Sequence, residues 1–357
     1  MAKPHPASRA EDALNGLVAR GLGRRGWRRR VLPYTGYAGT SFARVLGRVV
    51  LSKDGQDAQE PTVEADGGRR GFRVFFSAPL PEVDVTVTFG DATVSVATDR
   101  GGYIDVDLTD HGMPPGWHEA TISADEVETQ APVQVIGPDT AFGIISDIDD
   151  TCLVTSLPRP MHAAWNSFVL EETARKVVPG MPAMYRSLLA QNPDSPVIYL
   201  STGAWNTQPV LDRFLRRHGF PPGPMLLTDW GPTETAMFRS GQEHKHGSLR
   251  RLAMEFPHIK WLLVGDDGQH DPRIYEEFAL ERPESVDGIA IRKLTVAQKV
   301  LSHGHPLTKD DVRGRPVRLM VFEGSDGFAL HRLIQSARRQ RESVEAAQQS
   351  TRGGRDA

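Results

Sequence analysis

The chain has 357 residues, of which 39% are hydrophobic and 24% are charged. These proportions are those of a globular protein, and they exclude a disordered polyelectrolyte and a fibrous chain. At roughly 100–200 residues per domain, the length indicates two domains. The single cysteine, Cys152, excludes a disulfide-stapled scaffold and a thiolate zinc site, and it favours a reducing compartment.

The net charge of −3 is unevenly distributed along the chain. Residues 1–48 contain ten Lys or Arg against two Asp or Glu, so this part carries +8 and the remainder carries −11. An acidic body argues against a general nucleic-acid binder, and no nucleic-acid partner is expected.

Residues 1–33 are predicted to form a basic helical arm, because apolar residues at three- and four-residue spacing precede an arginine-rich segment. Near an anionic leaflet each basic residue contributes about 1 kcal/mol, so the arm is a candidate for peripheral membrane association. A solvated arm, or a helix packed on the protein's own core, is the alternative. No apolar run reaches the ~20 residues of a membrane span and no secretory signal is present, so we expect a cytoplasmic protein, peripheral at the inner membrane face if the arm binds.

Residues 34–138 are predicted to form an antiparallel β-sandwich domain. Apolar and polar residues alternate there, as in the segment from Val83 to Phe89, and glycine-containing turns separate the runs. This part contains no titratable cluster typical of catalysis, so it is interpreted as a structural or interaction module.

Residues 139–335 are predicted to form a doubly wound, Rossmann-like parallel α/β domain, followed by a polar, disordered tail over 336–357. Short apolar runs alternate there with amphipathic segments. Strands are expected at 142–146, 197–201, 225–228, 260–264, 288–291 and 317–322. Helices are expected at 209–218, 248–256 and 274–280, with one more after residue 325.

Acidic residues follow two of these strands. Asp147 and Asp149 follow the first strand, and the fourth is followed by Asp266, Asp267 and Asp271. Ligands of open parallel sheets bind beyond the carboxyl ends of the strands, so these carboxylates should converge. Their repulsion would be relieved by a hard divalent cation, and oxygen ligands of this kind are typical of Mg²⁺. Taken singly, each acidic pair is equally compatible with a helix cap or a turn.

Phosphate-binding groups are expected from two further segments. The second strand ends in Ser201, Thr202 and Gly203, which offer hydroxyl and backbone amide groups just before a helix. Lys245 precedes the third helix and could bring a cation to the same edge. Each of these is weak evidence alone, and the order of all four segments along the chain gives them their weight.

That order, Asp-x-Asp-x-Thr, a strand ending in Ser, a Lys, then Gly-Asp-x-x-x-x-Asp, resembles the four motifs of the haloacid dehalogenase-like phosphatase superfamily. More narrowly, residues 146–151, 178–180 and 265–272 resemble the catalytic domain of the actin-patch-protein family of Mg²⁺-dependent phosphatidate phosphatases, in the form of a bacterial member. The resemblance extends over about residues 141–294.

For catalysis, the resemblance implies that Asp147 is the nucleophile and that Asp149 is the general acid and base. It also implies that Ser201 and Lys245 hold the phosphoryl oxygens. Thr202 and Gly203 would contribute to substrate binding. Thr151 would fix the acidic segment 147–151 by hydrogen bonding.

For metal binding, the resemblance implies that Mg²⁺ is held by Asp147, Asp266 and the backbone carbonyl of Asp149. Asp271 would orient the ligands of the metal. Asp267 stands where a small hydroxyl residue is expected, so either Asp266 or Asp267 could be the principal ligand, and the spacing of Asp266 to Asp271 favours Asp266.

The implied activity is hydrolysis of phosphatidate to diacylglycerol through an aspartyl-phosphate, with the phospholipid substrate met at a membrane surface. Two alternatives stay open: a phosphatase of a soluble phosphomonoester, and a non-catalytic module that binds lipid or protein. The presence of both Asp147 and Asp149 favours an enzyme, because a binding module needs neither. The oligomeric state is not predicted.

Overall fold

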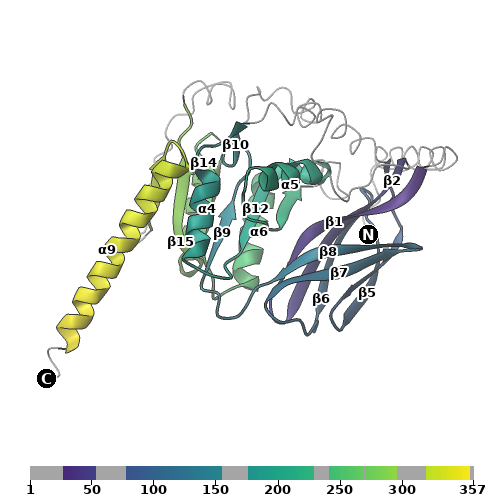
Figure 1. Cartoon of the computed structure of the whole chain (residues 1–357), viewed down its shortest axis with the longest axis horizontal. Helices are drawn as coiled ribbons and strands as arrows, with labels where there is room; N and C mark the ends of the chain where they lie inside the picture. The colour runs from purple at the N-terminus through teal and green to yellow at the C-terminus, as the bar shows by residue number, and fades with distance from the viewer. Residues whose placement is uncertain are drawn as a thin grey trace.

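The computed structural model describes residues 27–53, 78–154, 176–228, 241–268, 270–295 and 319–353. Two sheets lie side by side, and helix α9 (Gly327–Gly353) extends away from them toward the C-terminus (Figure 1). Most of the predicted N-terminal arm, residues 1–26, lies outside the described ranges.

The N-terminal sheet has eight strands joined by hydrogen bonds in the order β3-β2-β1-β8-β7-β4-β5, with β6 paired to β2. Its strands are β1 (Trp27–Ala38), β2 (Phe42–Lys53), β3 (Ala78–Pro79), β4 (Asp84–Phe89), β5 (Ala92–Ala97), β6 (Tyr103–Thr109), β7 (Gly116–Ala124) and β8 (Val127–Val135). Every pairing is antiparallel except that of β1 with β8.

Buried apolar residues alternate with more exposed residues along these strands, and the buried ones form a core distinct from that of the parallel sheet. In β4, for example, Val85, Val87 and Phe89 are buried and the intervening residues are not, so one face of each strand packs inward. The predicted sandwich has two facing sheets, whereas hydrogen bonds join these strands into one curled sheet. The cause is the length of β1, which pairs with β2 along most of its course and with β8 at its end.

The second sheet is parallel throughout and has the order β13-β12-β9-β14-β15-β16. Its strands are β9 (Phe142–Ser146), β12 (Val197–Ala204), β13 (Met225–Thr228), β14 (Lys260–Asp266), β15 (Val286–Arg292) and β16 (Val321–Gly324). After β9 the chain adds β12 and β13 on one side of the sheet, and after β14 it adds β15 and β16 on the other side. The strand order therefore reverses between β9 and β14, where open α/β sheets bind their ligands.

Helices cover this sheet. They are α4 (Met181–Ala190), α5 (Gln208–Arg217), α6 (Gly241–Glu255), α7 (Asp271–Glu281) and α9, with short 3₁₀ turns η3 (Trp205–Thr207) and η4 (Pro283–Ser285). A small hairpin of β10 (Leu153–Val154) and β11 (Lys176–Val177) lies beside the carboxyl end of β9. Helix α6 contacts α7, and α4 contacts α9.

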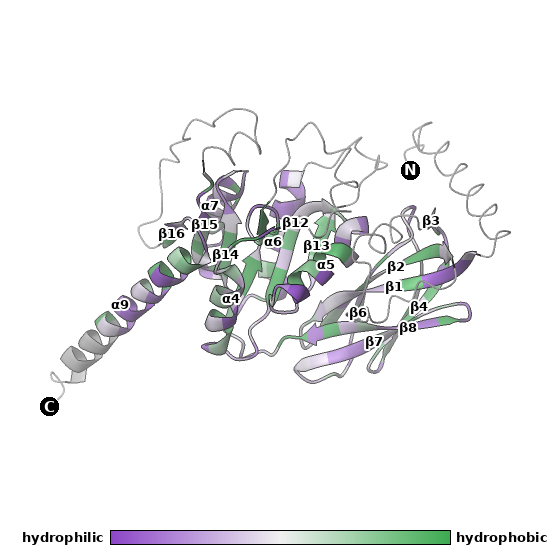
Figure 2. Cartoon of the chain, turned by 45° about the horizontal axis from the view of Figure 1, so that its top comes forward, coloured by the Kyte–Doolittle hydropathy of each residue, from purple (hydrophilic) through white to green (hydrophobic). Residues whose placement is uncertain are grey.

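The central strands are buried on both sides, which explains their uninterrupted apolar sequence. Gly143 of β9 is needed at its position, because a Cβ atom there would lie 2.4 Å from the ring of Trp261 on β14. In Figure 2 the hydrophobic residues gather along the strands. None of the described helices is both long enough and apolar enough to cross a bilayer.

The structure confirms the predicted strands 142–146 and 225–228 at both ends, and it differs from the prediction elsewhere. Strand β14 continues to Asp266, and β12 continues to Ala204. Residues 27–33, assigned to the arm, form the start of β1, because they pair antiparallel with residues 47–53 of β2. The tail expected to be disordered from residue 336 is helical to Gly353.

Candidate active site

Asp147 lies at the carboxyl edge of the parallel sheet, directly after the last residue of β9. Its backbone N–H donates to the carbonyl of Val264 on β14 at 2.9 Å, which fixes the first residue beyond the strand. The Asp147 side chain is buried, with 2% of the residue exposed. It therefore lies at the reversal of strand order described above.

Two further carboxylates reach the same place. Asp266 is the last residue of β14 and Asp271 is the first residue of α7, and both are buried. One carboxylate oxygen from each of Asp147, Asp266 and Asp271 lies within 4.8 Å of the other two. We call these three residues the acidic triad.

The acidic triad fits a hard divalent cation. The Oδ2 atoms of Asp147, Asp266 and Asp271 are buried and have no hydrogen-bond partner among the described residues. Oxygens about 2.1 Å from an octahedral cation lie about 3–4 Å apart, which the spacing of the triad permits. Since unpaired buried carboxylate oxygens are costly, a metal ion would supply the partner that the protein lacks.

Gly265 makes room for this arrangement. A Cβ atom at this position would lie 2.6 Å from Oδ2 of Asp271 and 2.8 Å from the ring of Tyr275. Any side chain at residue 265 would therefore displace the Asp271 carboxylate. The glycine that precedes Asp266 is thus a requirement of the packing around the triad.

Lys245 neutralises part of the triad from helix α6. Its Nζ lies 2.7 Å from Oδ1 of Asp147 and 2.5 Å from Oδ1 of Asp271, and all three side chains are almost fully buried. The lysine uses one oxygen of each carboxylate, whereas the other oxygen, Oδ2, stays unpaired among the described residues. The site can therefore hold a cationic side chain and a metal ion at the same time.

The charges in the site shift its pKa values strongly. Burial raises the pKa of Asp147 well above its ordinary value, and Lys245 opposes that shift. Burial, followed by the charges of Asp271 and Asp147, likewise raises the pKa of Asp266. Burial would lower the pKa of Lys245, but the charges of Asp147 and Asp271 outweigh it and raise that pKa. A bound cation would favour the ionised form of each carboxylate.

Ser201, near the carboxyl end of β12, contacts the loop that follows β9. We call this loop, residues 147–151, the acidic loop. The Ser201 Oγ donates to Oδ2 of Asp149 at 3.0 Å and accepts the backbone N–H of Gly203 at 2.9 Å. The carbonyl of Thr202 accepts the hydroxyl of Thr228 at 2.8 Å, which ties this loop to β13. The structure therefore brings the Ser201–Gly203 segment and Asp149 together.

Thr151 does not form the hydrogen bond expected of it. The residue is fully buried, but its Oγ1 has no hydrogen-bond partner among the described residues. Its backbone N–H instead donates to the carbonyl of Ile148 within the turn. Thr151 is thus packed inside the acidic loop, and its side chain does not tie the loop to another segment of the described chain.

The part of the chain that carries this geometry matches a known family. Residues 142–293 match the sequence profile of the family described as phosphatidate phosphatase APP1, catalytic domain. Over these residues the chain is similar to that family. We call residues 142–293 the APP1-type segment, and it contains Lys245, Ser201 and the whole acidic triad.

Two curated relatives match less than half of the chain. Phosphatidate phosphatase APP1 of Saccharomyces cerevisiae is 29% identical over 170 residues, which are 47% of this chain and 28% of the yeast protein. An uncharacterized protein of Schizosaccharomyces pombe is 27% identical over 42% of this chain and 25% of its own length. The match thus spans little more than a quarter of these relatives. A carbohydrate acetylesterase from Xanthomonas citri has a TM-score of 0.25 at 11% identity, over 76% of this chain and 74% of its own, and supports no inference.

Within the APP1-type segment, the structure separates two neighbouring aspartates that the sequence leaves as alternatives. The Asp266 carboxylate lies beside those of Asp147 and Asp271. Asp267 points elsewhere: its Oδ1 accepts the backbone N–H of Leu294 at 2.7 Å, and its Oδ2 lies 3.6 Å from Nζ of Lys293. Consecutive residues of an extended strand point to opposite sides, so only one of the two can lie beside Asp147 and Asp271.

Two residues that support Asp147 are absent from the predicted site. Ser146 Oγ donates to the backbone carbonyl of Asp147 at 2.6 Å, and the hydroxyl of Tyr185 on α4 lies 2.6 Å from the same Oγ. Cys152 is buried beside them, 3.4 Å from that carbonyl. Burial raises the pKa of Cys152, so its thiol stays protonated. The position of Ser146 next to Asp147 was the available signal, whereas Tyr185 had none.

Arg292 is a further residue that sequence reasoning missed. It ends β15, is buried, and donates from Nη1 to the backbone carbonyl of Asp150 at 2.6 Å. Asp150 has a φ of +55°, a left-handed conformation that aspartate tolerates better than most residues. Arg292 thus holds the acidic loop at its turn, and its place directly after a predicted strand was the signal for it.

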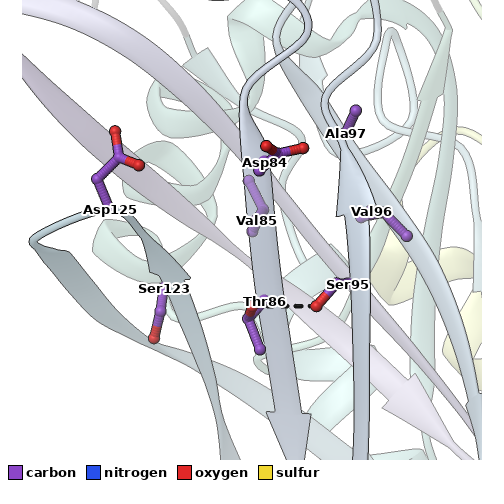
Figure 3. Close-up of a pocket in the computed structure, with 8 residues that line it drawn as sticks. All are labelled: Asp84, Val85, Thr86, Ser95, Val96, Ala97, Ser123 and Asp125. Atoms are coloured by element: carbon purple, nitrogen blue, oxygen red, sulfur yellow. Dashed lines mark hydrogen bonds between the residues drawn. The ribbon is translucent and has the colours of Figure 1, made fainter.

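A hollow on the N-terminal sheet offers no comparable chemistry. It is lined by residues of β4, β5 and the β7 turn, among them Asp84, Thr86, Ser95, Ser123 and Asp125 (Figure 3). The Thr86 and Ser95 hydroxyls share a hydrogen bond of 3.2 Å, and Asp125 pairs with Arg29. The lining contains no nucleophile with an adjacent base.

Proposed function

We propose that this chain is a metal-dependent phosphatase that hydrolyses phosphatidate to diacylglycerol and phosphate. The observation that carries the proposal is the shared use of two carboxylates: Lys245 pairs with one oxygen of Asp147 and one of Asp271, which leaves an oxygen of each for a cation. The family of the APP1-type segment supports the substrate class. A buried site with one fixed cation and room for another suits a dianionic phosphate monoester.

We infer that the metal ion is Mg²⁺ and that Asp147, Asp266 and Asp271 would hold or orient it, with the backbone carbonyl of Asp149 as a further ligand. All of these ligands are oxygens, which Mg²⁺ prefers. When bound, the ion would neutralise charge on the phosphate and on the carboxylates. His, Cys or Met side chains, which would favour softer metals, are not part of the triad.

In the first step of the proposed reaction, a carboxylate oxygen of Asp147 attacks phosphorus. The bond between phosphorus and the glyceride oxygen breaks, and Asp149 gives its proton to that oxygen, which leaves as the hydroxyl of diacylglycerol. Ser201 lies 3.0 Å from Asp149 and is placed to steer this proton. The product on the enzyme is an aspartyl-phosphate at Asp147.

In the second step, Asp149, now ionised, takes a proton from water, and the water oxygen attacks the same phosphorus. The bond between phosphorus and Asp147 breaks, which restores the carboxylate and releases inorganic phosphate. Lys245 and the Ser201–Gly203 segment would bind the phosphoryl oxygens in both steps, because their ammonium, hydroxyl and amide groups all donate hydrogen bonds. Thr202 and Thr151 would shape the loops that carry these donors.

We further infer that a haloacid dehalogenase-type domain extends from residue 139 to the end of α9 and that residues 27–138, which include the whole of β1, form a separate domain before it. Basic residues at 1–33 would favour a cytoplasmic enzyme that meets phospholipid at the inner membrane face. Sedimentation with anionic liposomes, before and after deletion of residues 1–26, tests that part. Undiminished binding after the deletion would contradict a role of the arm.

Phosphate release from phosphatidate in mixed micelles, and from soluble phosphomonoesters, tests the function. We expect turnover of phosphatidate that requires Mg²⁺, stops with EDTA, and falls by at least about a thousandfold in Asp147→Asn. Asp194→Asn, a substitution of an exposed aspartate in the turn after α4, is the matched control. Full activity in Asp147→Asn would refute the nucleophile, activity in EDTA would refute the metal, and turnover of soluble esters alone would replace the substrate.

A further inference from the structure

A continuous chain of hydrogen bonds links the N-terminal sheet to helix α6, the helix that carries Lys245. It begins and ends on β6, and its members are Asp105, Arg44, Tyr37, Glu255, Arg251 and Asp107. Arg44 belongs to β2 and Tyr37 to β1, whereas Glu255 and Arg251 belong to the last turns of α6. The APP1-type segment is therefore joined to the sheet that precedes it by side chains from both sides.

The central link of this chain is the hydrogen bond that Tyr37 donates to Glu255. The Tyr37 hydroxyl lies 2.7 Å from Oε2 of Glu255, and it accepts a hydrogen bond from Arg44 at 3.3 Å. Burial raises the pKa of Tyr37, so the hydroxyl keeps the proton that it donates. Tyr37 is fully buried, whereas the outer ion pairs at Asp105 and Asp107 are about half exposed and contribute less.

Aromatic packing reinforces the same junction. The ring of Phe256, directly after α6, lies 5.9 Å from the ring of Tyr37 and 5.4 Å from that of Phe42. The end of α6 is thus held by one partly buried hydrogen bond and by two rings of the N-terminal sheet.

The other end of α6 lies at the proposed phosphate site. A Cβ atom on Gly241 would be 2.6 Å from Cγ2 of Thr202, so the start of the helix lies directly against the Ser201–Gly203 segment. Lys245 follows one turn later. Glu255 is ten residues beyond Lys245, which is about 15 Å along a helix. Because a helix of this length moves as a stiff rod, a contact at Glu255 fixes where Lys245 lies along its axis.

A second contact reaches the segment after Ser201. Trp205, which directly follows β12, stacks on Tyr34 of β1 with ring centroids 5.5 Å apart and planes only 3° from parallel. Tyr103 of β6 packs on the same indole at 6.2 Å. Both donors proposed for phosphate, Lys245 and the Ser201–Gly203 segment, thus belong to elements that the N-terminal sheet holds in place.

We propose that the N-terminal sheet is a positioning part of the active site and that Tyr37, through Glu255 and α6, sets the placement of Lys245. The inference rests on the proposed function of Lys245 as a phosphoryl-binding group. It assigns the N-terminal sheet a role in turnover as well as in folding.

Tyr37→Phe is the sharpest test, because it removes one hydroxyl and keeps the ring. Tyr34→Phe is its matched control: the substitution is the same and lies on the same strand, but the buried Tyr34 hydroxyl has no hydrogen-bond partner among the described residues. The control also keeps the stacking on Trp205. Glu255→Leu removes the other half of the bond from the side of the helix and serves if Tyr37→Phe folds poorly.

We expect Tyr37→Phe to lower kcat for phosphatidate by about tenfold, since a small misplacement of a group in the site costs that much or more. The inhibition constant of inorganic phosphate should rise, while the Mg²⁺ concentration for half-maximal activity stays unchanged. Glu255→Leu, which also removes the pair with Arg251, should give at least a similar fall, and the double variant should lose no more than Glu255→Leu alone, because Tyr37→Phe breaks a bond that this variant already lacks. Tyr34→Phe should retain wild-type kcat.

Hydrogen exchange separates positioning from general destabilisation. In Tyr37→Phe, amides of α6 should exchange faster while those of α7 keep their rate, whereas a uniform loss of stability would accelerate both. Equal kcat and equal α6 exchange in Tyr37→Phe and Tyr34→Phe would overturn the proposal. If the wild-type protein hydrolyses no phosphomonoester, the proposed function fails, and faster exchange of α6 in Tyr37→Phe alone would still establish the link to that helix.

Discussion

The ammonium group of Lys245 lies 2.7 Å from Oδ1 of Asp147, and the two side chains are each only 3% exposed. A buried lysine is favourable only where carboxylates neutralise it, and buried carboxylates need a cation in return. The two residues are 98 positions apart in the chain, on α6 and after β9. Their pairing defines the centre of the site and underlies the first prediction.

Replacing Lys245 with Met should destabilise the metal-free protein by about 3–5 kcal/mol, because Asp147 and Asp271 lose the ammonium group that pairs with them. Addition of Mg²⁺ should recover part of that loss, since the ion supplies positive charge at the same carboxylates. Urea unfolding with and without Mg²⁺ measures both effects. Lys293→Met, which removes a lysine that is 43% exposed, is the control and should cost under about 1 kcal/mol. Equal losses in the two variants would contradict the prediction.

The two neighbouring aspartates should respond differently to loss of charge. Asp266→Asn should weaken Mg²⁺ binding by at least about tenfold, because it alters an oxygen of the triad. Asp267→Asn should leave it nearly unchanged, because asparagine can still accept the Leu294 N–H. Calorimetric titration of Mg²⁺ into each variant gives the comparison. A larger loss in Asp267→Asn would reverse the assignment that the geometry supports.

A methyl group added at Gly265 should disturb the triad. In Gly265→Ala the new Cβ meets Oδ2 of Asp271, so we expect a cost of about 1–3 kcal/mol and Mg²⁺ binding weaker by about 10–100-fold. Gly247→Ala is the control, since nothing lies within 4 Å of a Cβ there and alanine favours the helix by about 1 kcal/mol. Thermal unfolding with and without Mg²⁺ should move the two variants in opposite directions.

The single cysteine should be unreactive in the folded protein. Burial raises the pKa of Cys152 above its ordinary value, so the thiolate that reacts with iodoacetamide is scarce at about pH 8. The thiol should become reactive as the pH rises toward that higher pKa or when urea unfolds the chain. Mass spectrometry after timed alkylation measures this, and the chain contains no other cysteine to confuse the result. Rapid alkylation of the native protein would contradict the buried environment.

Much of the parallel sheet was predictable because its signal is local. Continuous apolar runs identify buried strands, and the strands at 142–146 and 225–228 have the predicted bounds. The limits of β14 were harder, since its last residue is Asp266 and a charged residue normally marks the end of a strand. Here Asp266 pairs with Arg292 of β15, so the strand continues into the site.

The joining of the N-terminal strands into one curled sheet and the continuation of α9 beyond residue 336 were not predicted, for a related reason. A sequence pattern shows which face of a strand is buried, but the choice of neighbour is made by pairing between distant segments, such as β1 with β8. Similarly, the composition of α9 indicates solvent exposure, and exposure does not exclude a helix whose first turns are anchored by Leu330 and Ile334.

The sequence by itself determined which polar and charged residues lie at the strand ends and the edge of the sheet to which they belong. Motif spacing and strand ends are properties of the chain, so Asp147, Ser201, Lys245 and Asp271 were predictable as a group. Only the tertiary structure decided that Asp266 and not Asp267 lies beside Asp147 and Asp271. It also decided that Tyr185 contacts Ser146 and that Tyr37 contacts the end of α6. These outcomes depend on side-chain direction and on contacts between segments more than 30 residues apart, which no local pattern encodes.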